Sequence, residues 1–212
     1  MGGRADESPL TALGERQAAQ LGAAGLPAST SCWFTSTAVR TRETARLARE
    51  QLCQRSGGAQ AGGQAAAAPM VHARELLEID MGAFSGRRRA ECYTPGVREA
   101  IERDCHNFAP PGGESQRQVE ERVVRYIETE VLPRCEGGGP PAVVVAHGVA
   151  IKCFLRRILG SDAAMTWKIQ LNNTSITEVG LVEDPEDARA GWHLLRVNDH
   201  AHTREWGDRQ RN

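Results

Sequence analysis

The sequence predicts an α/β domain, a three-layer sandwich in which a mostly parallel central sheet carries helices on both faces. Strand-like apolar runs alternate with helical patterns along the chain, and no internal repeat is present. The run AVVVAHGVAI at 142–151 passes from a buried-strand pattern directly into a helical one. A strand that leads at once into a helix is the unit from which parallel sheets are built.

Polar residues mark the beginnings of two predicted helices. Thr11 is a candidate N-cap for a first helix over 12–25. Ser115, with Gln118 three positions later, forms a capping box for a helix that runs to about residue 132. The buried stripe of that helix consists of Val119, Val123, Ile127 and Val131.

The two hydrophobic periods place the other elements. We expect strands at 31–36, 71–72, 142–146, 174–182 and 192–197, and helices over about 38–54, in parts of 87–108, and over 149–159. Gly, Ala and Gln dominate 56–69, which predicts a flexible surface loop. Two glycines in 76–86 favour an irregular segment. We therefore predict one domain over 1–203 and a polar tail at 204–212.

Composition narrows the class of protein. A length of 212 residues fits one domain, and 40% hydrophobic with 25% charged residues is ordinary for a globular chain. The net charge of −1 argues against a nucleic-acid partner. The chain contains no apolar run of membrane-spanning length and no secretory signal pattern, so we expect a cytoplasmic protein, with organelle targeting left open. The oligomeric state is also left open.

Metal and disulfide chemistry are not predicted. The six cysteines are widely spread, with no C-x-x-C pair, which favours reduced packing thiols over disulfides. His200 and His202 are close in sequence but have no neighbouring Cys or carboxylate at zinc spacing. We expect no metal site.

Two junctions between strand and helix predict a phosphate site. His147 and Gly148 follow a buried strand where a helix begins, and free N–H groups at such a helix start attract anions. Arg40 lies in the first turn of another helix that follows a strand, where its guanidinium could bind a phosphate bidentately. The alternatives are a packed histidine and a solvated helix charge.

Two carboxylates are further candidates. Glu78 lies between apolar residues, four positions before Gly82; partial burial there would raise its pKa and let it deliver a proton to a leaving oxygen. The alternative is a surface glutamate on a loop. Glu114 follows a Pro-Pro-Gly-Gly turn, where it could orient a histidine or cap a helix, and both interpretations stay open.

Seven motifs in series resemble the histidine phosphatase superfamily, which contains the phosphoglycerate mutases and the fructose-2,6-bisphosphatase domain. In chain order they are DESPLTALGERQA, TSTAVRTRETA, LLEIDMGAFSG, PPGGES, VVVAHG, NTSIT and LLRVNDHAH. The resemblance implies that Arg40 is the family's second arginine, Glu78 its proton donor and His147 its second histidine. Glu114 and Gly148 are expected to contribute to substrate binding. The resemblance implies a small phosphorylated substrate, phosphate monoester hydrolysis, and no metal or nucleotide cofactor.

One family motif is missing from the printed sequence. The nucleophilic histidine of the family stands in an Arg-His-Gly triplet at the end of the first central strand, upstream of the position of Asp6, where this chain has MGGRA. We expect an incomplete copy, inactive as given, whose missing strand would lie in the middle of the sheet and leave its neighbours unpaired. The competing hypothesis is a pseudophosphatase that binds phosphorylated ligands or protein partners.

Overall fold

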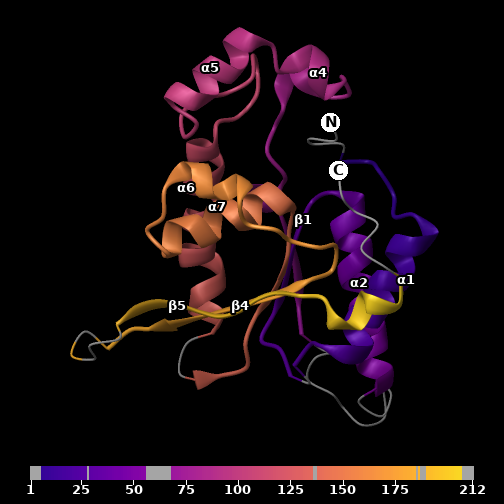
Figure 1. Ribbon diagram of the computed structural model, residues 1–212. Helices are drawn as coiled ribbons and strands as arrows, with labels where there is room; N and C mark the ends of the chain where they lie inside the picture. The colour runs from indigo at the N-terminus through magenta and orange to yellow at the C-terminus, as the bar shows by residue number, and fades with distance from the viewer. Residues whose placement is uncertain are drawn as a thin grey trace.

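The computed structural model describes residues 6–27, 29–55, 68–135, 138–184, 186 and 190–206. Its central sheet is parallel, with the strand order β2-β1-β3. A separate antiparallel ribbon is formed by β4 and β5 and extends away from this sheet (Figure 1). The strands are β1 (Trp33–Ser36), β2 (Met70–Ala73), β3 (Val143–Val145), β4 (Ile176–Val182) and β5 (Gly191–Asp199).

Helices cover both faces of the parallel sheet, with α1 and α2 on one side and α6 and α7 on the other (Figure 1). They are α1 (Ala12–Ala24), α2 (Val39–Arg55), α4 (Arg89–Cys92), α5 (Pro95–Arg103), α6 (Gln116–Tyr126) and α7 (Gly148–Ile158). The short helices α4 and α5 belong to a long excursion between β2 and α6. The predicted order of strands and helices is confirmed.

Adjacent residues of β1 build the two cores. Trp33 packs with Leu52 and the other apolar residues of α1 and α2, whereas Phe34 packs with Val119 and the apolar faces of α6 and α7. Both aromatic side chains have no exposed surface. Because successive strand residues point to opposite faces, this pair establishes the three-layer arrangement that the sequence predicts.

The predicted helix caps are present. The Thr11 hydroxyl accepts a hydrogen bond from the amide of Gly14 at 3.1 Å. Ser115 and Gln118 bond reciprocally, each side chain accepting from the other residue's amide. The helix after Ser115 is α-helical to Tyr126 and continues as one π-helical turn, 127–131. All four residues of its predicted stripe, Val119, Val123, Ile127 and Val131, are buried.

The described part of the chain reaches the first residues of the predicted C-terminal tail. A 3-10 helix spans Ala201–Trp206, so the first residues of the expected tail at 204–212 are helical. Thr203 is buried, and its amide and its hydroxyl both donate to the His200 carbonyl, each at 2.9 Å. Residues 207–212, and most of the loop expected at 56–69, lie outside the described part of the chain.

Among the residues that the structure describes, every strand except β1 has one edge without a ladder. β3 pairs with β1 on one side, and β4 pairs with β5 on one side, without a ladder on the other. All three valines of β3 are only half-buried. Within the same ranges, no helix is both long and apolar enough to cross a lipid bilayer.

Candidate functional site

The predicted site residues gather where β1 and β3 end and where α2 and α7 begin. Ser36 is the last residue of β1, and Arg40 is the second residue of α2. His147 is the N-cap residue of α7, with an extended backbone and no side-chain capping bond of its own. The imidazole of His147 is therefore available for contacts across the sheet, as the strand-to-helix junction in the sequence predicts.

His147 is held from two sides. Its Nε2 lies 2.7 Å from the Ser36 hydroxyl, and its Nδ1 lies 3.1 Å from a guanidinium nitrogen of Arg40. Only 7% of His147 is exposed. Burial first, and then the positive charges of Arg40 and Arg122, lower the pKa of His147 to about 3, so the ring is neutral at pH 7.

Glu78 lies at the beginning of α7. Its carboxylate accepts hydrogen bonds from the Ile79 amide at 2.9 Å and from the Val149 amide at 3.1 Å. Gly148 stands between His147 and Val149, and a Cβ at this position would lie 3.7 Å from the Glu78 carboxylate. The proton-donor candidate and the histidine candidate thus meet at one helix N-terminus, where the helix dipole favours negative charge.

Glu114 is part of a brace for the Glu78 segment. Its two carboxylate oxygens accept from Arg122 at 3.0 Å each, a bidentate pair, and one of them also accepts from the Asp80 amide at 3.1 Å. Arg122 further donates to the carbonyls of Glu75 and Glu78. The helix cap is supplied by the neighbouring Ser115. The substrate-binding role expected of Glu114 stays a prediction.

A tight crossing of two turns joins the ends of the excursion that contains α4 and α5. The Ala83 amide donates to the Pro111 carbonyl at 2.9 Å, and the Glu114 amide donates to the Asp80 carbonyl at 2.8 Å. Gly82 has a φ of +47°, and a Cβ there would lie 2.3 Å from the Pro111 carbonyl oxygen. The irregular segment predicted from its glycines therefore has a defined shape, because only glycine fits this crossing.

Sequence reasoning missed three residues that hold the site residues in place: Ser36, Thr41 and Arg122. Ser36 and Thr41 lie within a motif that the sequence analysis quotes, but a hydroxyl at a strand end carries no signal of its own. Their oxygens lie 2.7 Å apart, and both residues are almost fully buried. Arg122 is one of several arginines in its segment, and only the fold separates this half-buried side chain from the exposed ones.

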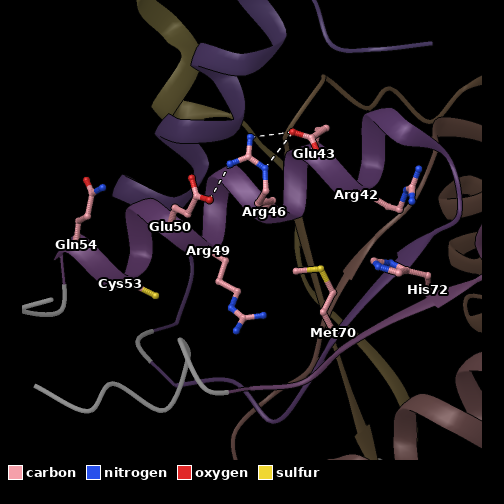
Figure 2. A pocket seen from close by; sticks show the side chains of 9 residues that line it. All are labelled: Arg42, Glu43, Arg46, Arg49, Glu50, Cys53, Gln54, Met70 and His72. Carbon is pink, nitrogen blue, oxygen red and sulfur yellow. Dashed lines mark hydrogen bonds and ion pairs between the residues drawn. The ribbon is translucent and has the colours of Figure 1, made fainter. Parts of the chain in front are cut away.

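A separate recess of about 720 Å³ lies between α2 and β2, and Figure 2 shows its lining residues. Arg46 in this recess is paired with Glu43 at 2.8 Å and with Glu50 at 2.7 Å. None of the predicted site residues lines it. No cluster of three metal-ligating side chains is found within the described ranges.

Comparison with known proteins shows to which family the chain belongs. The model of the histidine phosphatase superfamily (branch 1) matches residues 1–200, and the chain belongs to this superfamily. Its relatives place it among the phosphoglycerate mutase-like members. Proteins of this family act on small phosphorylated substrates.

The relatives resemble the chain over most of its length. A probable phosphoglycerate mutase GpmB of Klebsiella pneumoniae is 30% identical over 201 residues, spanning 92% of this chain and 84% of the relative. The mycobacterial glucosyl-3-phosphoglycerate phosphatase bound to VO3 is 25% identical with a TM-score of 0.74, over 94% of this chain and 90% of the other. Bacillus stearothermophilus YhfR, 23% identical with a TM-score of 0.73 over 95% and 90% of the two chains, shares the fold.

Proposed function

We propose that Arg40, His147 and Gly148 bind the phosphoryl group of small phosphate monoesters, in a site built for their hydrolysis. The observation that carries this proposal is the contact of 3.1 Å between Arg40 and His147 at the first turn of α7. A guanidinium and a helix N-terminus that face the same point supply positive charge and directed N–H donors, which phosphate oxygens require.

Glu78 is proposed as the proton donor to the leaving oxygen. Its carboxylate is fixed by the Val149 amide at the same helix start, next to the proposed phosphoryl position. A carboxyl group held within one turn of the transferred group has the location that general acid catalysis needs. Phosphoglycerate and sugar phosphates, which the names of the relatives suggest, are the first substrates to test.

For the sequence as printed, we propose binding without turnover. Phosphoryl transfer to histidine requires a ring nitrogen with a free lone pair, in line with the leaving oxygen. His147 has its Nδ1 against the Arg40 guanidinium and its Nε2 against Ser36, so neither nitrogen is presented as a nucleophile. This arrangement also favours the alternative function, a pseudophosphatase that binds phosphorylated ligands or protein partners.

Calorimetric titration with orthovanadate and inorganic phosphate tests the binding site. We expect Arg40→Ala to weaken binding about tenfold or more, because a charge-assisted pair is lost, and added salt to weaken binding to the wild-type protein. Arg42→Ala is the matched control, since Arg42 is an exposed arginine of the same helix turn. Equal affinity of wild type and Arg40→Ala would reduce Arg40 to a solvated helix charge.

Turnover is measured with p-nitrophenyl phosphate. We expect no hydrolysis above a blank and no phosphohistidine. Activity that survives purification and disappears in His147→Ala would overturn the proposal of binding without turnover and would make His147 part of the reacting machinery.

A further inference from the structure

The hydrogen atoms around His147 can be assigned from one end of the cluster. A guanidinium only donates hydrogen bonds, so Nδ1 of His147, 3.1 Å from Arg40, must be the accepting nitrogen. The ring is neutral at pH 7, and its single N–H therefore lies on Nε2. This N–H points at the Ser36 oxygen, 2.7 Å away, which must accept it.

The assignment continues through two hydroxyl groups. Because Ser36 accepts from Nε2 and also from the Ala38 amide at 3.3 Å, its own hydrogen goes to the Thr41 oxygen at 2.7 Å. Thr41 in turn donates to the Ala38 carbonyl at 2.9 Å. The result is a directed chain of donors from His147 through Ser36 and Thr41 to a backbone carbonyl, in which no hydrogen is assigned to two acceptors and no lone pair to two donors.

Burial fixes the direction of donation along these hydrogen bonds. Ser36 has no exposed surface and Thr41 is 4% exposed, so water does not substitute for a missing partner. A reversed direction would put a hydrogen on Nδ1, against the donors of Arg40, in a site where an unsatisfied polar group is costly. The same direction of donation excludes Ser36 as a nucleophile activated by His147, because Nε2 has no lone pair to offer.

We propose that Ser36 and Thr41 are positioning residues that fix His147 in its Nε2–H tautomer, so that Nδ1 accepts from Arg40 and holds that guanidinium at the proposed phosphoryl site. The directed chain of hydrogen bonds is inferred from contacts in the ligand-free protein. Its effect on phosphate binding rests on the proposed function. Nδ1 then orients the Arg40 guanidinium, whose remaining N–H groups are the donors offered to phosphate oxygens.

The test reads the tautomer directly. Two-dimensional 1H–15N spectra of the histidine side chains at pH 7 distinguish Nε2–H from Nδ1–H in the wild type, Ser36→Ala, Thr41→Val and Thr41→Ser. Thr41→Val keeps the branched shape and removes the acceptor of the Ser36 hydrogen, and Thr41→Ser restores a hydroxyl. Amide spectra and thermal melts show whether each variant is folded.

We expect the pure Nε2–H pattern in the wild type and in Thr41→Ser. Thr41→Val frees the Ser36 hydrogen to turn toward Nε2, so a mixture of the two tautomers is expected there. Vanadate affinity should fall about three- to tenfold in Thr41→Val, the equivalent of one hydrogen bond, and return in Thr41→Ser.

Two results would overturn the inference: an Nδ1–H pattern in the wild-type protein, or a Thr41→Val protein that keeps both the wild-type tautomer and the wild-type affinity. If vanadate binds none of the proteins, the proposed function fails. The tautomer patterns still test the direction of the hydrogen bonds from His147 to Thr41 in that case, because they are recorded without ligand.

Discussion

Replacing His147 should change how the stability of the protein depends on pH. The folded-state pKa of about 3 lies below the ordinary value of 6.5. The unfolded chain therefore binds a proton more readily than the folded one, and the contribution of His147 is fully present above pH 6.5. It is lost as the pH falls toward 3. At pH 5 the loss attributable to this one group is about 2 kcal/mol, from 1.36 kcal/mol per pKa unit.

Urea unfolding of wild type and His147→Gln at pH 7.5 and pH 5.0 measures this difference. Other groups titrate in both proteins and cancel when the two losses are subtracted. The wild type should lose about 2 kcal/mol more than His147→Gln between these pH values. Equal losses for wild type and His147→Gln would refute a buried neutral His147.

Three further predictions concern the framework of the site. Arg122→Ala should lower the free energy of unfolding by about 3 kcal/mol, because it removes the bidentate partner of the partly buried Glu114 carboxylate and the donor to the Glu75 and Glu78 carbonyls. Arg117→Ala, on the exposed face of the same helix, should change it little in the same urea titration. Gly82→Ala should cost more stability than Gly86→Ala, although both have positive φ, because only at position 82 does the new Cβ meet backbone. An apolar strand ending in Arg-His-Gly-Glu, fused by a short linker ahead of Asp6, should raise the melting temperature by pairing with the open edges and should bring turnover; a fused strand interrupted by proline should do neither.

Local patterns predicted most of the fold. The caps at Thr11 and Ser115 and the stripe that contains Val119 were readable because each depends on residues within a few positions of one another. The sheet order β2-β1-β3 was not readable, since it depends on which strands lie side by side after the chain has crossed over twice. The 3-10 helix Ala201–Trp206 was not readable either, because the bonds from Thr203 to the His200 carbonyl have no signature in composition.

The candidate site also contains residues that the sequence indicates and residues that only the fold reveals. Arg40 and His147 could be named from the sequence because each stands at a junction between a strand and a helix, and the structure brings them within 3.1 Å. Ser36 and Thr41 could not be assigned a role, because their contacts join residues 111 and 5 positions apart through buried oxygens. Arg122 is similar, since its value lies in reaching the carbonyls of a segment more than forty residues earlier.

Because the turns at Gly82 and Pro111 cross and bond to each other, the segment between them can be replaced as a unit. Its two ends are fastened to each other, and Glu78 is braced from α6, so the helices α4 and α5 can vary without displacing the proton-donor candidate. We expect grafts between 87 and 103, of different length and charge, to fold on this scaffold, because His106 and its contacts with α6 and α7 are then kept. Substitutions in that stretch would then accumulate without disturbing the segment that holds Glu78.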